Sequence, residues 1–198
     1  MSSSRVSPPL RLVVLISGNG SNLQAIIDDI NNNQLPAEIV AVISNKADAY
    51  GLVRAKKANI PQHVLSHRDY DNRKQYDIAL QRLIDQYKPD LVILAGFMRI
   101  LSDEFVQHYS HKIMNIHPSL LPKYKGLNTH QRVLDAGDKE HGCSVHFVTA
   151  TLDDGPVILQ ATVAVNENDN AETLAAKVHR QEHRIYPQAI RMFAENKI

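Results

Sequence analysis

Residues 12–28 read "LVVLISGNGSNLQAIID" and join a continuous apolar run to a glycine turn and a second, periodic apolar segment. The run at 12–17 is typical of a strand covered on both faces, because a strand with one wet face alternates instead. The spacing that follows predicts a helix over 21–33, and Ser21 with Gln24 has the pattern of a capping box at its start. Strand, glycine turn and helix in this order predict the first unit of an α/β sheet.

The same alternation continues toward the carboxyl terminus. We expect strands at 38–44, 90–96 and 112–116, and helices at 49–59, 71–87, 102–109 (capped by Ser102 or Asp103), 129–136 and 171–195. Two further β-rich runs, 143–150 and 156–165, lie on either side of "TLDDG" and predict an antiparallel pair with a functional loop. The predicted fold class is therefore α/β, an open and largely parallel twisted sheet with helices on both faces and antiparallel strands in the C-terminal part. We expect one domain over 1–198, with a loose tail at 1–9.

Composition narrows the class of protein. The 198 residues are 43% hydrophobic and 22% charged with a net charge of +1, which is ordinary for a globular domain and gives no basis for nucleic acid as a partner. No apolar run approaches the length that spans a membrane. The single cysteine, Cys143, cannot form an internal disulfide, so we expect a reducing compartment, the cytoplasm.

The glycine turn, "SGNGSN" at 17–22, is the first candidate site. A turn between a buried strand and a helix presents backbone N–H groups and the positive end of the helix, which suits a phosphate. Its glycines permit positive φ and close approach of a ligand to the backbone. The pattern is not GxGxxG, and no acidic residue ends the second strand, so a dinucleotide is disfavoured. The alternative is a plain turn with a helix cap.

The second candidate is "MNIHPSLLPKYKG" at 114–126. Asn115 and His117 are two apart on an extended chain, so their side chains share a face, and the loop follows a strand at the edge where α/β sheets bind ligands. An amide beside an imidazole can stabilise a developing oxyanion and move a proton. Pro118 and Pro122 constrain the turn, and we expect a cis peptide bond between Leu121 and Pro122.

A carboxylate in "LDDGP" at 152–156 could orient His117, and the residues alone leave Asp153 and Asp154 as equal candidates. Other features carry less. "HRQEH" at 179–183 lacks the glutamate position of HExxH and a third ligand, so we predict no metal site. His146 alternates within a strand and is interpreted as structural. Cys143 has no nucleophile signature around it.

The segments "VVLISGNGSNLQAIID", "SNKADAYGL", "LAGFMRIL", "NIHPSLLPKYKG" and "DDGPVILQ" together resemble the phosphoribosylglycinamide formyltransferases, folate-dependent enzymes of purine synthesis. The resemblance runs from about residue 11 to about residue 195 and implies a Rossmann-like formyltransferase fold. It implies transfer of a formyl group from 10-formyltetrahydrofolate to the primary amine of N1-(5-phospho-D-ribosyl)glycinamide, with no metal. We expect these two small molecules as the only partners, and a monomer or weak homodimer.

The resemblance also assigns roles. Asn115 and His117 match the catalytic amide and imidazole, and Asp153, two residues before the glycine, matches the essential aspartate. The ribonucleotide would bind Gly20, Ser21, Asn22 and Glu182, and the folate would bind Met98, Arg99, Ile100, Leu101 and Asn115, with Arg73 near its carboxylate tail. The implied halves are 10–100 for the phosphate and 101–198 for folate and catalysis. Many bacterial members have proline and histidine where this chain has Lys125 and Asn128, which leaves any role of that histidine in doubt.

Three alternatives need to be distinguished. Formyltetrahydrofolate deformylase shares the catalytic loop and passes the formyl group to water, but it carries an N-terminal regulatory domain, which we do not expect because the first strand begins near residue 12. Methionyl-tRNA formyltransferase adds a C-terminal β domain, which is likewise not expected. A non-catalytic nucleotide-binding module would have no use for Asn115, His117 and Asp153 together.

Overall fold

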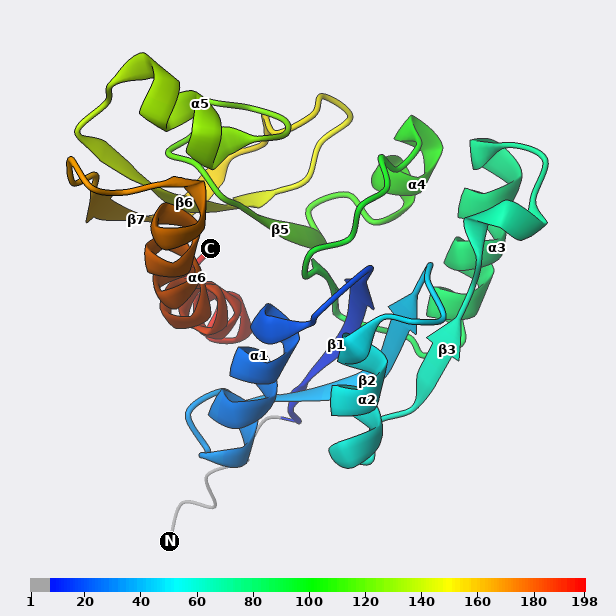
Figure 1. Ribbon diagram of the computed structural model, residues 1–198. Helices are drawn as coiled ribbons and strands as arrows, with labels where there is room; N and C mark the ends of the chain where they lie inside the picture. The colour runs from blue at the N-terminus through cyan, green and yellow to red at the C-terminus, as the bar shows by residue number, and fades with distance from the viewer. Residues whose placement is uncertain (1–7) are drawn as a thin grey trace, which may run out of the picture.

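The computed structural model describes residues 8–198, so most of the predicted tail at 1–9 lies outside the described residues. One sheet contains seven strands in the order β3-β2-β1-β4-β5-β6-β7 (Figure 1). The strands are β1 (Leu10–Ile16), β2 (Ala37–Ser44), β3 (Gln62–Val64), β4 (Leu91–Leu94), β5 (Ile113–His117), β6 (Glu140–Phe147) and β7 (Val157–Ala164). The helices are α1 (Ser21–Asn31), α2 (Tyr50–Lys57), α3 (Arg73–Asp85), α4 (Asp103–His108), α5 (Thr129–Ala136) and α6 (Ala171–Ala194).

The strand pairing confirms the predicted fold class. Strands β1 to β5 pair in parallel, and β6 and β7 join the sheet in antiparallel fashion. The chain moves from β1 outward to β3, and then returns to the other side of β1 with β4. This reversal makes the carboxyl ends of β1 and β4 a topological switch point, where open α/β sheets bind ligands.

Two hydrophobic cores cover the two faces of the sheet. Alternate residues of β1 take part in both: Leu12, Val14 and Ile16 pack with α1, α2 and α6, whereas Val13 and Leu15 pack with α3 and α4. All five side chains are fully buried. The continuous apolar run of β1 therefore reflects helices on both faces, as the sequence predicts.

Several local expectations are wrong. The residue before α1 is Gly20 in the left-handed region (φ 75°) with no side-chain cap, so Ser21 is the first helical residue and forms no capping box. Strand β3 and a 3₁₀ turn at His67–Asp69 are absent from the sequence prediction, because three residues carry too little pattern to read. Strand β6 begins at Glu140, three residues before its predicted start. The expected cap at Ser102 is confirmed by its acceptance of the Phe105 N–H.

The predicted cis bond between Leu121 and Pro122 is confirmed. Within residues 8–198, no helix is both long and apolar enough to cross a membrane.

Candidate active site

The loops that follow β1, β4 and β5 lie at one edge of the sheet. The loops that follow β1, β2 and β4 are linked by Ser17, whose Oγ donates to Asn45 Oδ1 at 2.6 Å and accepts from the Met98 N–H at 2.8 Å. Ser17 and Asn45 are buried, so these bonds are shielded from competing water. The glycine turn after β1 and the loop after β4 are therefore held in a fixed relation to each other.

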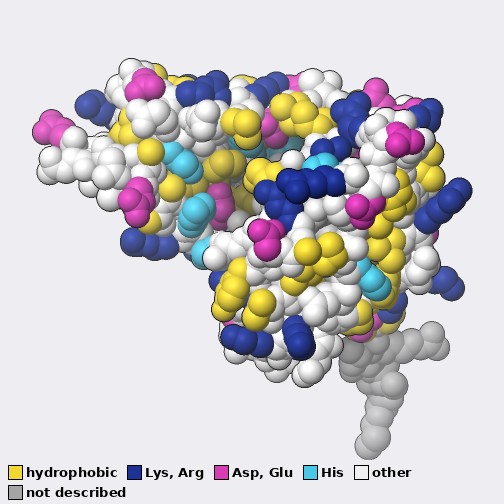
Figure 2. All heavy atoms as spheres, turned by 45° about the vertical axis from the view of Figure 1, so that its right-hand side comes forward, with side chains coloured by type: hydrophobic (Ala, Val, Ile, Leu, Met, Phe, Trp, Pro, Cys, Tyr) yellow, Lys and Arg dark blue, Asp and Glu magenta, His cyan; other side chains and the backbone are white. Residues whose placement is uncertain are grey.

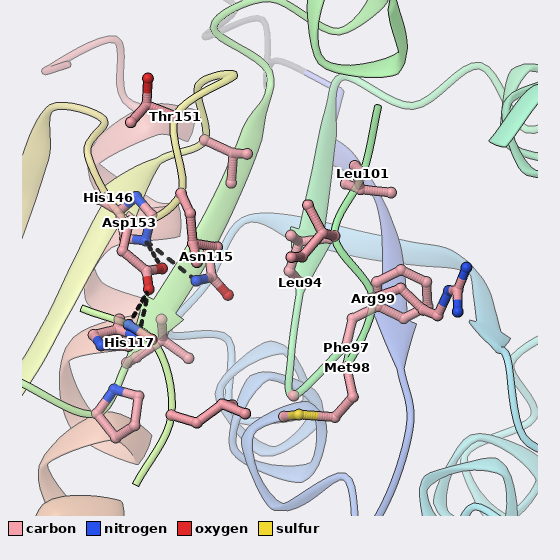
Figure 3. Close-up of a pocket in the computed structure, with 18 of the residues that line it drawn as sticks. Leu94, Phe97, Met98, Arg99, Leu101, Asn115, His117, His146, Thr151 and Asp153 are labelled. Carbon is pink, nitrogen blue, oxygen red and sulfur yellow. Dashed lines mark hydrogen bonds and ion pairs between the residues drawn. The ribbon is translucent and has the colours of Figure 1, made fainter. Parts of the chain in front are cut away.

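A cavity of about 580 Å³ opens at this edge (Figure 3). Its walls include apolar side chains that are unusually exposed, and Figure 2 shows a hollow on this face with hydrophobic and histidine side chains around it. Met98 is 65% exposed, Ile100 59%, Leu127 76% and Leu152 52%. Exposed apolar groups gathered around a cavity are typical of a ligand-binding groove.

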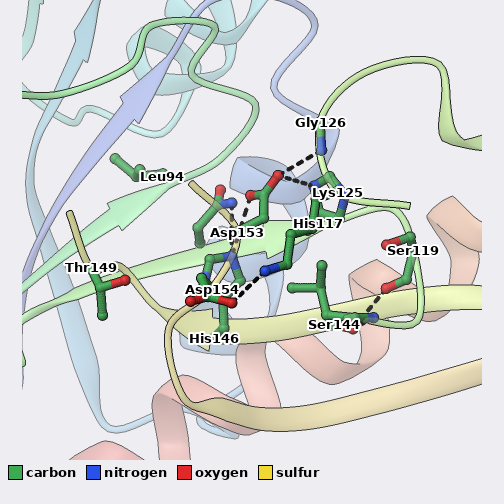
Figure 4. Close-up of polar contacts among 12 residues, drawn as sticks. Leu94, His117, Ser119, Lys125, Gly126, Ser144, His146, Thr149, Asp153 and Asp154 are labelled. Carbon is green, nitrogen blue, oxygen red and sulfur yellow. Dashed lines mark hydrogen bonds and ion pairs between the residues drawn. The ribbon is translucent and has the colours of Figure 1, made fainter. Parts of the chain in front are cut away.

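The three predicted catalytic side chains meet on one wall of this cavity. Asn115 and His117 belong to β5, and Asp153 reaches them from the loop between β6 and β7 (Figure 3); Figure 4 shows the contact of Asp153 with His117. Asp153 Oδ2 lies 3.4 Å from His117 Nδ1, and both side chains are about nine-tenths buried. Asp154 instead points outward and pairs with Lys125. The geometry thus separates two aspartates that the residue pattern leaves equivalent.

His117 has an acceptor on each ring nitrogen. Its Nε2 lies 2.9 Å from the Tyr124 carbonyl oxygen, and a carbonyl can only accept, so this nitrogen carries a proton. The carboxylate of Asp153 faces the other nitrogen. A ring with two protons satisfies both acceptors, and Asp153 Oδ2 also accepts the Gly126 N–H at 2.9 Å.

His146 has a contact that its structural interpretation misses. Its Nδ1 donates to the Phe147 carbonyl at 3.0 Å, so in the neutral ring Nε2 is free to accept from Asn115 Nδ2 at 3.2 Å. Burial lowers the pKa of His146 and keeps the ring neutral. His146 therefore fixes the direction of the Asn115 amide. The signal is the pairing of Asn115 with His146 across β5 and β6, which only the strand register reveals.

The residues predicted for the ribonucleotide lie together at the start of α1. Gly20, Ser21 and Asn22 form its N-terminus, and Asn22 Nδ2 donates to Glu182 Oε2 of α6 at 2.9 Å. Both of these side chains are buried, and burial raises the pKa of Glu182. The structure therefore brings together two residues that are 160 positions apart in the chain.

The residues predicted for the folate divide into two groups. Met98, Arg99, Ile100, Leu101 and Asn115 line the cavity, whereas Arg73 does not: it is exposed at the first residue of α3.

Cys143 is buried, and burial raises the pKa of its thiol to about 12. Among residues 8–198, no group of three or more His, Cys, Asp or Glu side chains is arranged to hold a metal ion.

An open α/β sheet carries an amide, an imidazole and a carboxylate beside a cavity at its strand ends, an arrangement that suits an enzyme acting on a carbonyl group. The formyl transferase family model matches residues 10–190. The chain belongs to the formyl transferase family and, within it, to the phosphoribosylglycinamide formyltransferases, enzymes of purine biosynthesis. The resemblance found in the sequence is thereby confirmed.

Individual relatives support this placement. The phosphoribosylglycinamide formyltransferase of Escherichia coli K12 is 56% identical over 189 residues, which is 96% of this chain and 89% of that protein. The solved structure of the Coxiella burnetii enzyme is 56% identical, with a TM-score of 0.91 over 95% of this chain and 88% of that one. The glycinamide ribonucleotide transformylase 1 of Symbiobacterium toebii is 44% identical, with a TM-score of 0.95 over 99% and 92%.

Proposed function

We propose that this protein transfers the formyl group of 10-formyltetrahydrofolate to the primary amine of N1-(5-phospho-D-ribosyl)glycinamide, giving the N-formyl product in de novo purine (IMP) biosynthesis. The substrate class follows from the family. The observation that carries the proposal is the convergence of Asn115, His117 and Asp153 on one wall of the cavity. A module that only binds nucleotides has no need of this arrangement.

The ribonucleotide is assigned to the edge formed by α1 and α6. The first N–H groups of a helix have no partner within it, and here no side chain caps them, so Gly20, Ser21 and Asn22 suit a phosphate. Glu182, held by Asn22, faces the same region and is assigned to the rest of the ribonucleotide.

The folate is assigned to the cavity. Its flat ring system matches the apolar rim of Met98 and Ile100, and Arg99 and Leu101 complete that wall. Arg73, outside the lining, is assigned only to the carboxylate tail, the part of the folate that would extend beyond the cavity. The proposed halves, 10–100 for the phosphate and 101–198 for catalysis, meet here.

The chemistry is acyl transfer through a tetrahedral intermediate. The amine attacks the formyl carbon, and the carbonyl oxygen gains negative charge. One Asn115 Nδ2 hydrogen is bonded to His146, so the second is available for this oxyanion, and the ring of His117, whose two nitrogens face Tyr124 and Asp153, stabilises the charge from beside it. Asp153 orients His117 and can order a water that carries a proton from the attacking amine to N10 of the folate as the bond between N10 and the formyl carbon breaks. Because the folate ring already activates the leaving amine, no step requires a metal.

The deciding experiment mixes the protein with 10-formyltetrahydrofolate and follows folate absorbance with and without the ribonucleotide. We expect deformylated folate to accumulate only when the ribonucleotide is present, with one formylated product per folate released. Release at the same rate without ribonucleotide would identify a hydrolase and overturn the proposal.

A further inference from the structure

The segment 124–128 carries one hydrogen-bond partner for each member of the catalytic pair. The Tyr124 carbonyl accepts from His117 Nε2 at 2.9 Å, and the Gly126 N–H donates to Asp153 Oδ2 at 2.9 Å. A displacement of this segment would therefore move the imidazole and the carboxylate together. Its position is part of the catalytic geometry.

The backbone of the segment is not in a relaxed conformation. Tyr124 has φ 54°, Gly126 φ 82° and Asn128 φ 55°; glycine adopts the left-handed region freely and asparagine readily, so the cost falls mainly on Tyr124. A side chain at positive φ costs free energy, and such residues persist only where their surroundings hold them. Something outside the segment must supply that restraint.

Arg132 supplies it from α5. Its Nη1 donates to the carbonyl oxygens of Lys125 at 2.7 Å and Leu127 at 3.2 Å, on either side of Gly126. Its guanidinium lies 5.3 Å from the centre of the Tyr124 ring. One side chain therefore contacts three of the five residues, and two of its contacts are with backbone atoms.

Two further contacts, both outside the catalytic residues' own bonds to the segment, restrain only side chains. Tyr124 Oη donates to Asp138 at 2.8 Å, and Lys125 pairs with Asp154 on the surface. A proline at position 125 would fix φ from within the chain. Here the residue is lysine, and the backbone contacts of Arg132 take the place of that internal stiffness.

We propose that Arg132 is a positioning residue for formyl transfer, holding the segment 124–128 so that the Tyr124 carbonyl and the Gly126 N–H meet His117 and Asp153. The catalytic consequence rests on the proposed function, whereas the restraint of the segment does not. Arg132 has no assigned contact with either substrate, so it acts through the segment alone.

The first test removes the donors in two neutral variants, Arg132→Met and Arg132→Leu. We expect kcat to fall about tenfold, since the catalytic pair loses alignment, while both KM values stay within about twofold. Gln131→Met is the matched control: it changes the adjacent exposed residue of α5, whose amide bonds only to Asp135, and should leave kcat unchanged. Wild-type kcat in a folded neutral variant overturns the proposal.

The second test restores stiffness by another route. In the structure, no residue within 8–198 accepts a hydrogen bond from the Lys125 N–H, so proline can replace it without breaking one. Lys125→Pro in the Arg132→Met background should recover most of the lost kcat. No recovery, when Lys125→Pro alone is active, would count against the proposal.

The third test is independent of catalysis. Amide hydrogen exchange at Gly126, measured by NMR, should be about tenfold faster in Arg132→Met than in wild type, with exchange in β5 unchanged. If exchange at Gly126 is faster in Arg132→Met but the wild-type protein shows no formyl transfer, the restraint by Arg132 stands and the proposed function is rejected. Unchanged exchange at Gly126 rejects the restraint itself.

Discussion

The orientation of each reactive side chain in this site is fixed by contacts with neighbouring residues. Asn115 is oriented by His146, and His117 is held between the Tyr124 carbonyl and Asp153. Groups held in this way need little reorganisation when charge develops on a substrate oxygen. Two substitutions test the two kinds of group, donor and carboxylate, separately.

Asn115→Ala should keep the fold and lose turnover. The side chain is half-buried at the end of β5, so the deletion affects the cavity wall more than the core. Loss of one oxyanion donor typically raises the barrier by ~2.7–4 kcal/mol, which is a fall in kcat of roughly a hundredfold or more. The measurement is steady-state kcat together with the melting temperature. A kcat close to wild type would remove Asn115 from the mechanism.

Asp153→Asn removes charge while preserving shape. Asp153 has φ 49°, a conformation that asparagine also tolerates, so the loop should keep its path. Without the carboxylate the His117 ring loses the charged group that orients it, and kcat should fall sharply while substrate affinity changes little.

The matched control is Asp154→Asn, the same change one residue along the loop. It breaks only the exposed pair with Lys125, which contributes about 0–1 kcal/mol, and should stay active. Kinetics of both variants decide the matter: the assignment is falsified if Asp154→Asn is crippled and Asp153→Asn is not.

Among the secondary-structure elements, the glycine turn and α2 are in close backbone contact near the site. A Cβ at Gly20 would lie 2.6 Å from Gly51 Cα, and Gly20 has φ 75°. The sequence pattern attributes Gly20 to phosphate approach. The structure adds a packing requirement, in which the start of α2 lies directly against the turn.

Gly20→Ala should therefore destabilise the whole protein. The positive φ alone costs about 1–3 kcal/mol for a residue with a Cβ, and the clash with Gly51 adds to it. Gly18→Ala is the control, because a Cβ there meets nothing within 4 Å. Urea unfolding of both variants gives the comparison. Equal stabilities would show that the turn and α2 can move apart at no cost.

The contact between α5 and β6 predicts a pH dependence. His130 Nδ1 and His141 Nε2 share a hydrogen bond of 3.0 Å, which needs one nitrogen to accept and so one ring to be neutral. Burial lowers the pKa of His130 and lowers that of His141 to about 4, with Asp138 opposing at His141 and His117 and His179 nearby. Both rings are therefore neutral when the protein is folded at pH 7.

Because the folded pKa of His141 is below its unfolded value of about 6.5, the unfolded chain binds the proton first as the pH falls. The free energy of unfolding should be fully retained above pH 6.5 and should decline from there toward about pH 4. His141→Asn should flatten this decline. Urea midpoints at pH 7.5 and pH 5 measure it, and an equal decline in both proteins would exclude the pair as its source.

In the molecule as a whole, α6 packs against one face of the sheet, next to the strands that carry the site. Tyr186, fully buried on α6, has its hydroxyl 2.8 Å from the Leu94 carbonyl and 3.0 Å from the Met114 carbonyl. These carbonyls belong to β4 and β5. The loop after β4 lines the cavity, and β5 carries Asn115 and His117. One hydroxyl of the last helix therefore ties together the strands that support both.

Tyr186→Phe should lower the free energy of unfolding by about 0.5–1.5 kcal/mol, because it removes one buried hydrogen bond that the two carbonyls share. Tyr50→Phe is the control, since Tyr50 is 47% exposed and its hydroxyl makes no hydrogen bond in the described structure. Urea unfolding of the two variants is the measurement. An equal loss of unfolding free energy in both variants would show that the Tyr186 hydroxyl contributes nothing specific to stability.

Much of this architecture can be inferred without coordinates. The unbroken apolar run of β1 predicts a strand with helices on both faces, and the glycine turn predicts a ligand at its end. Asn115 and His117 are two apart in an extended segment, so their shared face is also readable. These features are local: they depend on the period of a strand or a helix, and a few neighbouring residues encode it.

Other features arise only from the packed chain. The approach of Asp153 to His117, the pairing of His146 with Asn115, and the contact of Arg132 with the segment 124–128 each join residues whose separation depends on strand register or helix placement. A register shift of one residue would turn His146 to the other face of the sheet. Local pattern therefore decides which elements form and which side chains can react, while long-range packing decides which of them meet, because burial and strand pairing are properties of the whole chain.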